Sequence, residues 1–357
     1  MTHSARLVDL VSARLDRFFD ERASILAALG DDVEPLMTYS RSFLSGGKRF
    51  RALFAYWGFR SVAELADSNA PFDSEPDDHL NVIVGVAAAL ELFHAAALVH
   101  DDIIDNSDTR RGKPAAHRRF EELHRVSGFA GSAERFGRSA ATLFGDLLLS
   151  WSDELFSESL DERIHSSWAR SARAEFNLMR TEVTAGQYLD VLEENAWPTV
   201  AESDLRARAE RVALYKSAKY SIEAPLRIGA AVAGASPAQL RTLSEFGRPL
   251  GIAFQLRDDV LGVFGDPAVT GKPAGDDLIE GKRTVLIAMA RERLQSGARR
   301  LLDELLGDRE LSADQVRMLQ QTIRECGAEQ ELEHHIERMV SESLAALDVG
   351  SLGPRSS

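Results

Sequence analysis

Cysteine is almost absent from this sequence, since Cys326 is the only one. A single cysteine allows no disulfide within the chain and no cysteine cluster that could hold zinc or an iron–sulfur centre. The sequence also lacks an uninterrupted apolar run of the signal-peptide kind, because arginines and aspartates separate the leucines and phenylalanines of residues 1–30. We therefore expect a cytoplasmic protein whose first thirty residues form an amphipathic helix.

Positive charge is outweighed by negative charge: 42 lysines and arginines face 56 aspartates and glutamates, a net charge of −14. This balance argues against a nucleic-acid-binding surface. One stretch, Leu80–Val99, is apolar enough to suggest a membrane span. It contains Glu91 and His94 and continues into an acidic segment, which a bilayer would tolerate poorly. We predict a helix buried in the protein and no transmembrane segment.

Alternating β-branched runs are nearly missing, and no proline occurs between Pro114 and Pro198. Alanine, leucine, arginine and glutamate dominate, and all four favour helices. The predicted fold class is all-α, with a single helical domain over residues 1–349 and a flexible tail over 350–357. The predicted loops are residues 66–79, 126–133 and 265–282.

Two acidic sets follow apolar helical segments. In HDDIID, His100–Asp105, the carboxylates of Asp101 and Asp105 are four residues apart and share a helical face, with Asp102 adjacent. Acids at the carboxyl end of a helix oppose its dipole and need a positive partner. In FQLRDDVLG, Gln255, Asp258 and Asp259 lie on or near one face of a second helix. Either set alone could be a solvated helix surface, because such short patterns match freely.

Basic clusters lie around these acids in the sequence. SGGKRFR (45–51) offers Lys48 and Arg51 with i, i+3 spacing, and RRGKPAAH (110–117) follows the first acidic set. Each could simply form surface ion pairs, yet together with the acids they describe a site where Mg²⁺ bridges carboxylates and a diphosphate. Further candidates, each with a structural alternative, are Gln187, Asp190, Lys216, Ser217, Lys272 and Lys282.

The order of these motifs between Gly46 and Lys282 resembles that of the trans-isoprenyl diphosphate synthases, the polyprenyl synthetase family, and in particular of bacterial geranylgeranyl diphosphate synthases. The resemblance implies a bundle of helices around a deep central cavity, usually in a homodimer. It also implies an Mg²⁺-dependent prenyltransferase that condenses isopentenyl diphosphate with an allylic prenyl diphosphate.

The resemblance also assigns roles by position. It implies about three Mg²⁺ ions per active site, bound with diphosphate. Their ligands would be Asp101, Asp105 and Asp258. The catalytic set would be Asp101, Asp102, Asp105, Arg110, Lys216, Asp258 and Asp259. The allylic diphosphate would be bound by Arg110, Lys216, Ser217, Gln255, Lys272 and Lys282, and isopentenyl diphosphate by Lys48, Arg51, His94 and Arg111.

Two features bear on how this chain departs from the pattern of the family that it resembles. The family's second acidic motif usually reads DDxxD, whereas Gly262 occupies its last position here. We expect activity to survive, although a role for a third carboxylate comes into doubt. Ala96 and Ala97 stand where makers of fifteen-carbon products tend to carry an aromatic floor, and Phe93 is the next bulky side chain. This predicts geranylgeranyl diphosphate as the product.

Alternatives remain at this stage. The chain could make farnesyl diphosphate or longer polyprenyl diphosphates, could be a class I terpene cyclase, or could be a non-catalytic subunit of a heteromeric synthase. The paired arginines and the GGKRFR segment speak against a cyclase, and the retained aspartates speak against a non-catalytic subunit. All these assignments assume that the two acid-bearing helix ends face each other across a shared cavity.

Overall fold

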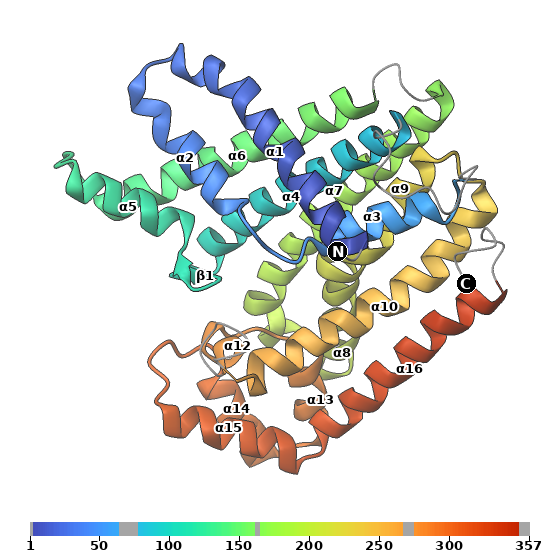
Figure 1. Cartoon of the computed structure of the whole chain (residues 1–357). Helices are drawn as coiled ribbons and strands as arrows, with labels where there is room; N and C mark the ends of the chain where they lie inside the picture. The colour runs from blue at the N-terminus through green and yellow to red at the C-terminus, as the bar shows by residue number, and fades with distance from the viewer. Residues whose placement is uncertain (1–2, 64–77, 161–164, 267–274, 350–357) are drawn as a thin grey trace. The chain divides into compact units, whose positions relative to one another are not determined.

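The computed structural model describes residues 3–63, 78–160, 165–266 and 275–349. The chain forms two compact units, the first made of Met1–Ala172 and Ile228–Ala235 and the second of Arg173–Arg227 and Ser236–Ser357. Figure 1 labels the elements. The predicted all-α fold class is confirmed, since the described residues contain one pair of two-residue strands and otherwise helices and their connections.

Helices of the N-terminal half make up most of the first unit. In chain order it begins with α1 (His3–Ala27), η1 (Asp31–Val33), α2 (Glu34–Phe43), α3 (Phe50–Arg60), α4 (Asp78–Ile104), β1 (Thr109–Arg110), β2 (Lys113–Pro114), α5 (Ala116–Val126) and α6 (Ala133–Leu160). Both units share α7 (Ser166–Ala196) and α9 (Ala224–Val232). The second unit contains η2 (Trp197–Thr199), η3 (Glu202–Asp204), α8 (Leu205–Val212), η4 (Ala213–Glu223), α10 (Pro237–Phe264), α12 (Asp276–Glu280), α13 (Val285–Arg293), α14 (Ser296–Leu305), α15 (Ala313–Glu325) and α16 (Ala328–Val349).

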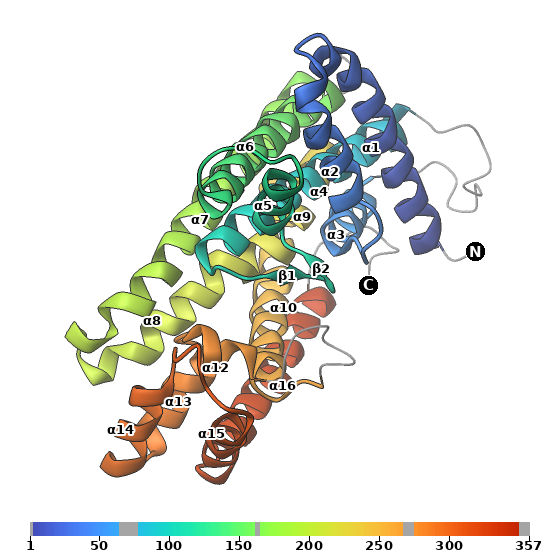
Figure 2. The same cartoon turned by 90° about the vertical axis from the view of Figure 1, so that its left-hand side faces the viewer.

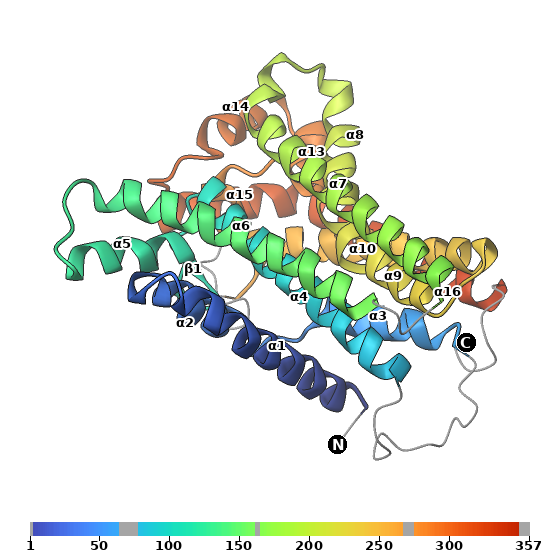
Figure 3. The ribbon, with the colours of Figure 1, turned by 90° about the horizontal axis from the view of Figure 1, so that it is seen from above.

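Helix α4 is the core of the first unit. It packs against α1, α3, α5 and α6, and Figure 3 shows α1, α4 and α6 running side by side. By length and composition His79–Ile104 could cross a membrane, but 83% of its most apolar window is buried within the protein. An all-round apolar helix is expected where every face packs on a neighbour. The prediction of a buried helix over Leu80–Val99 is confirmed.

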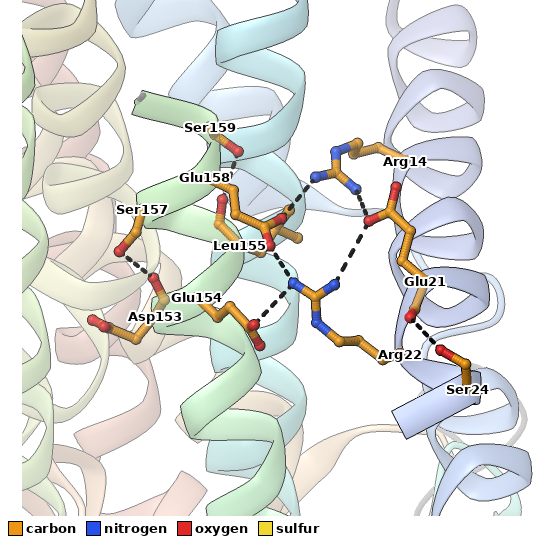
Figure 4. A network of polar contacts seen from close by, with 10 residues as sticks. All are labelled: Arg14, Glu21, Arg22, Ser24, Asp153, Glu154, Leu155, Ser157, Glu158 and Ser159. Carbon is orange, nitrogen blue, oxygen red and sulfur yellow. Dashed lines mark hydrogen bonds and ion pairs between the residues drawn. The ribbon is translucent and has the colours of Figure 1, made fainter. Parts of the chain in front are cut away.

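Helix α1 confirms the amphipathic helix expected near the start of the chain. Its buried face carries Leu7, Val11, Leu15 and Phe18, at spacings of three and four residues. Its polar side is tied to α6 by an ionic network (Figure 4). In this network Arg22 pairs with Glu154 at 2.9 Å and also with Glu158, and Arg14 lies 3.4 Å from Glu158. Apolar burial and ion pairing therefore hold α1 on the first unit from two sides.

The second unit is built on α10. A capping box between Ser236 and Gln239 begins this helix, and η4 and α16 pack along it. Figure 2 shows α16 running alongside α10, and the hydroxyl of Ser343 donates to the carbonyl oxygen of Phe246 at 2.8 Å between them. The apolar side chains of α10 share one core with Leu286 of α13 and with neighbouring helices.

The predicted loops agree with the structure in part. The connection between α5 and α6 confirms the loop over residues 126–133. The prediction of an unbroken loop over 265–282 is wrong, because α12 lies within it. Leu278 on this short helix is buried and anchors the segment in the core. The surrounding glycines and lysines are typical of a loop, so the sequence pattern did not indicate this contact. Most of the 66–79 loop and the tail over 350–357 lie outside the described residues.

Candidate active site

The first acidic motif lies where α4 ends. Asp101 and Asp102 occupy its last turn, and the amide of Asp105 donates to the carbonyl oxygen of Asp101 at 2.8 Å, so the helical turn continues to Asp105. The side chain of Asp102 is fully buried, whereas that of Asp101 is 20% exposed. The predicted pair of carboxylates four residues apart is therefore present at a helix end, with a buried third acid beside it.

The arginines of RRGKPAAH lie on a β-hairpin that the sequence pattern did not predict. Strand β1 pairs with β2 in antiparallel register. The two residues between them, Arg111 and Gly112, have φ angles of 53° and 72°. A two-residue hairpin turn of this kind requires positive φ at both positions. The hairpin fixes the backbone from which both arginines project.

Arg110 is the positive partner that the acidic helix end needs. Its Nε donates to Oδ1 of Asp102 at 2.8 Å, and its Nη2 lies 3.5 Å from Oδ2 of Asp101. Burial alone would lower the pKa of Arg110, but the carboxylates of Asp102, Asp101 and Asp105 outweigh burial and raise it. The guanidinium is thus a permanent cation held beside the first acidic motif.

A pocket of about 230 Å³ opens beside the hairpin. A first side-chain carbon built on Gly47 would lie 3.3 Å from Nη1 of Arg111, so the SGGKRFR segment approaches the hairpin closely. Four cationic groups on one pocket suit an anion with several oxygens, such as a diphosphate. Sequence reasoning gave Lys113 no role, and nothing in the spacing marked Arg119. The lining residues are Ser42, Phe43, Ser45, Gly47, Arg110, Arg111, Lys113, Pro114 and Arg119.

Three of the four residues expected to bind isopentenyl diphosphate influence one another electrostatically. Burial, followed by the charges of Arg51 and Arg111, holds the pKa of His94 well below its ordinary value, so its ring is neutral at pH 7. Lys48 is exposed and precedes α3, and the backbone of Arg49 between Lys48 and α3 is left-handed. Lys48 therefore lies outside the helix that carries Arg51, and their convergence on one anion stays a prediction.

The sequence analysis also missed a buried ion pair. Glu91 lies with its Oε2 3.6 Å from Nη1 of Arg49, and both side chains are more than nine-tenths buried. Burial raises the pKa of Glu91, while the charges of Arg51 and Arg49 act to lower it. Glu91 is thus the internal counterion of these arginines. Its place in a long apolar run had marked it only as an argument against a membrane span.

The second acidic motif lies in the last turns of α10. Nε2 of Gln255 donates to Oδ1 of Asp259 at 2.7 Å, which confirms that these two residues share a helical face. Asp258 is exposed and Asp259 is buried. Burial is the main cause that raises the pKa of Asp259, the hydrogen bond from Gln255 acts against it, and the charges of Asp277, Asp258 and Asp190 add to the rise. Together they bring this pKa to about 8. Negative charge is therefore crowded here, and a cation would relieve it.

The remaining predicted cations of the second unit pair with acids. Lys216 lies on the π-helix η4. π-Helices are rare in proteins, and those that occur are often found at functional sites. The ammonium group of Lys216 pairs with Asp190 of α7, and Ser217 follows it, half-buried, on the same helix. Lys282 follows α12 and lies 2.7 Å from Oε2 of Glu280 and 3.9 Å from Oδ1 of Asp277. Lys272 lies outside the described residues.

Each unit thus contains acids and cations of the kind that handle a diphosphate, and comparison with known proteins gives them a context. The family model for polyprenyl synthetase matches residues 33–323. The chain belongs to the polyprenyl synthetase family.

Relatives of this polyprenyl synthetase support the assignment. A crystal structure of geranylgeranyl pyrophosphate synthase from Corynebacterium glutamicum, complexed with isoprenyl diphosphate and magnesium, is 39% identical with a TM-score of 0.89, and the match covers 99% of this chain and 96% of that one. Geranylgeranyl diphosphate synthase from Methanosarcina mazei is 31% identical over 85% of this chain and 80% of its own. Short chain isoprenyl diphosphate synthase from Methanocaldococcus jannaschii is 32% identical over 67% of this chain, and the match spans 65% of its length.

These comparisons confirm the family, the all-α fold and the enzyme class, a trans-prenyltransferase, predicted from the motifs. The residue roles carried over by position stay predictions. The structure brings Asp101, Asp102 and Asp105 together with Arg110 in the first unit. It brings Gln255, Asp258 and Asp259 together with Asp190 in the second.

The donor groups of this synthetase fit magnesium. Carboxylate oxygens are the hard ligands that Mg²⁺ prefers, and Mg²⁺ usually takes one or two of them together with phosphate oxygens and waters. Among the described residues, no group of three histidines, cysteines or acids converges as a complete metal cage. A site that offers only one or two carboxylates to the metal suits an ion that is bound together with a diphosphate, whose oxygens supply further ligands.

The raised pKa of Asp259 predicts a pH dependence of stability. An aspartate whose folded pKa lies near 8 and whose unfolded pKa lies near 3.8 stabilises the fold below about pH 4. That contribution is lost progressively as the pH rises toward 8. In metal-free buffer, the unfolding free energy of the native protein minus that of Asp259→Asn should therefore fall between pH 5 and 8 and then level off. Denaturant unfolding at each pH measures this difference, and a flat difference would contradict the buried, protonated acid.

Proposed function

We propose that this polyprenyl synthetase condenses isopentenyl diphosphate with an allylic prenyl diphosphate and releases geranylgeranyl diphosphate. The observation that carries the proposal is the pocket lined by four cations beside an acidic helix end, with Arg110 joining the two. Related geranylgeranyl diphosphate synthases support the twenty-carbon product.

The acids and cations would divide the work on the allylic diphosphate. We assign Asp101, Asp105 and Asp258 as the carboxylates that hold about three Mg²⁺ ions. When bound, magnesium supplies positive charge that stabilises the departing diphosphate. Asp102 keeps Arg110 in place through its hydrogen bond, and Arg110 binds a diphosphate oxygen. On the second unit Lys216, Ser217, Gln255, Lys272 and Lys282 bind the same group, with Asp259 supporting Asp258.

The isopentenyl diphosphate would bind to the first unit at Arg111, which lines the pocket beside the hairpin. Arg51, Arg111 and Lys48 hold its diphosphate, and the neutral ring of His94 adds a hydrogen bond without a further positive charge. The carbon–oxygen bond of the allylic substrate then breaks and its electron pair leaves with the diphosphate. The isopentenyl double bond forms the new carbon–carbon bond, and a proton passes to the released diphosphate.

The test is a direct assay of the purified full chain. It is incubated with isopentenyl diphosphate and dimethylallyl, geranyl or farnesyl diphosphate in turn, with and without Mg²⁺, and the products are sized. A magnesium-dependent twenty-carbon diphosphate supports the proposal. A farnesyl or longer diphosphate would overturn the product assignment, a hydrocarbon or alcohol would indicate a cyclase, and the absence of product would indicate a non-catalytic subunit.

Product length gives a prediction on α4. Phe93 and Ala96 are buried there and Ala97 is half-buried, and we propose that they limit the growing chain. Phe93→Ala should shift the product toward longer chains because it removes a bulky wall, and Ala97→Phe should shift it toward fifteen carbons. Chromatography of the dephosphorylated products measures both. Phe129→Ala, at a half-exposed position between α5 and α6, is the matched control. An unchanged distribution in both α4 variants would remove these residues from the wall.

We also propose a homodimer acting in the cytoplasm. The family resemblance supports the dimer, and Leu143 on α6 and Tyr188 on α7 are apolar side chains left about two-thirds exposed in the single chain. Light scattering after size-exclusion chromatography measures the mass in solution, and a mass of one chain would contradict the dimer.

A further inference from the structure

A small cavity lies within the second unit, between α7, η2, α8 and α13. Its volume is about 20 Å³, which is enough for one water molecule or one ion of similar size. Four of its lining side chains are leucine, isoleucine or alanine, so part of the wall is apolar. The other four belong to Glu193, Trp197, Arg283 and Arg291. Two arginines at so small and so apolar a cavity require an explanation, because an isolated buried charge is costly.

Both arginines lie against the indole ring of Trp197. Cζ of Arg283 is 3.7 Å from the ring centroid and Cζ of Arg291 is 5.1 Å from it, so the ring faces two cations. The side chains of Arg283 and Arg291 are only 11% and 10% exposed. Within the part of the chain that the structure describes, the buried Nε of each has no hydrogen-bond partner. Two buried N–H donors at the cavity thus remain to be satisfied, which is costly unless an acceptor binds there.

The positive charge of these two arginines is only partly balanced. Both pair with the same carboxylate, that of Asp303 on α14, whose Oδ1 lies 3.4 Å from Nη1 of Arg283. Burial, followed by the charge of Arg291, lowers the pKa of Arg283 to about 10, although the charge of Glu194 acts to raise it. Burial also lowers the pKa of Arg291. One more negative charge at the cavity would offset the repulsion between the two guanidinium groups.

The acid that lines the cavity is already bound elsewhere. Oε2 of Glu193 accepts a hydrogen bond from Nε of Arg208 at 2.7 Å, and Oε1 lies 4.0 Å from Nη2 of Arg211. The charge of Glu193 is therefore shared by two arginines of α8. Its Oε1 is buried and accepts no hydrogen bond from any described residue. The alternative occupant of the cavity is thus a water molecule that bridges this oxygen to Arg283 and Arg291.

We propose that this cavity is a binding site for one monatomic anion of the size of chloride, held by the Nε groups of Arg283 and Arg291. Hydrogen bonds from a guanidinium group to an anion are stronger than those to a neutral acceptor, which favours the anion over water. The cavity is too small for sulfate, phosphate or diphosphate. A bound anion would hold α13 against η2 and α8. The site is independent of the proposed reaction, because it lies apart from both acidic motifs in the sequence and uses none of their residues.

Thermal unfolding of the full chain tests the site in solution. Sodium gluconate is replaced stepwise by sodium chloride in metal-free buffer at constant ionic strength, so that only the anion changes. An anion that binds the folded chain alone should raise the melting temperature by about 2 °C for each tenfold increase in chloride above the dissociation constant. Bromide should act like chloride because it is a halide of similar size, whereas sulfate at the same ionic strength should not produce this rise.

Two variants assign the effect to the cavity. Arg291→Met removes one of the two donors and leaves Asp303 paired with Arg283 alone, so the chloride dependence should disappear while the melting temperature in gluconate stays near that of the native chain. Arg317→Met is the control, because Arg317 on α15 is 67% exposed and pairs on the surface with Asp314. This control should keep the full response to chloride.

Crystals of the native chain grown in sodium bromide locate the ion directly and do not depend on the folding of a variant. An anomalous bromide peak within hydrogen-bond distance of Nε of Arg283 and Nε of Arg291 supports the proposal. A water molecule in the cavity without anomalous signal, or bromide bound only at exposed arginines elsewhere, would overturn it. The same conclusion would follow from a folded Arg291→Met variant with the native response to chloride. None of these measurements involves a prenyl substrate, so failure of the proposed reaction would be seen separately in the product assay.

Discussion

Replacing Asp101 with asparagine should lower the rate of condensation by about 10²–10³-fold or more, because it removes one charge of the first acidic motif at the point where the departing diphosphate must be stabilised. The fold should persist. Asp101 is partly exposed, and Asp102 retains its shorter hydrogen bond to Arg110. The change therefore tests the chemistry of the helix end with little change in packing.

The measurement compares kcat and the Mg²⁺ dependence of the rate in the native enzyme and in Asp101→Asn. Asp108→Asn is the matched control, since Asp108 lies just beyond α4, is 73% exposed and pairs only on the surface with Arg118 at 2.7 Å. Its rate should stay within about twofold of native, as expected for an exposed pair worth under 1 kcal/mol. Near-native turnover in Asp101→Asn, with an unchanged melting temperature, would reject the assignment of the first motif.

The sequence predicted well those helices whose apolar residues form a long pattern, either along one face or on all sides. The apolar run over Leu80–Val99 identified α4, because no other structure buries such a stretch in a helical protein. Residues 1–30 showed the spacing that α1 uses to bury Leu7, Val11 and Leu15. Asp101 and Asp105 could be assigned to a helix end because they directly follow the apolar helical run of α4.

The parts that were missed depend on contacts between residues distant in sequence. Strands of two residues have no periodicity, so the hairpin that carries Arg110 could not be read from the pattern. Helix α12 was hidden because its leucine stands alone among glycines and charges. The spacing also gave no sign that the carboxylate of Asp277 lies against Gly262, since only the folded chain brings the two together.

Replacing Glu91 with glutamine should lower the unfolding free energy by about 3–5 kcal/mol, the cost of removing one partner of a buried ion pair. The side chain of Arg49 is only 2% exposed, and its remaining hydrogen-bond acceptors are neutral: the carbonyl oxygen of Leu44 at 2.8 Å and the hydroxyl of Ser12 at 3.2 Å. The carboxylate of Glu91 also accepts the backbone amide of Ala52, in the first turn of α3, where a negative charge favours the helix.

Denaturant unfolding of three variants measures the effect and its cause. Glu122→Gln is the control, because Glu122 is 63% exposed and should contribute under 1 kcal/mol. The double variant Glu91→Leu/Arg49→Met removes both charges and should be clearly more stable than Glu91→Gln, since apolar pairs often replace buried ion pairs at little cost. Equal losses in the single and double variants would show that packing, rather than an unpaired charge, sets the cost.

The same substitution, Glu91→Gln, should also weaken the binding of isopentenyl diphosphate. The charges of Arg51 and Arg111 act on Glu91, and both also act on His94, so one buried carboxylate offsets the repulsion within this group of cations. Without it, the two arginines lose the charge that holds them near each other, and the KM for isopentenyl diphosphate should rise while that for the allylic substrate changes little. A loss of stability with both KM values unchanged would confine Glu91 to the fold. A selective rise would make this acid the link between the packing of α3 on α4 and the binding of the substrate that attacks.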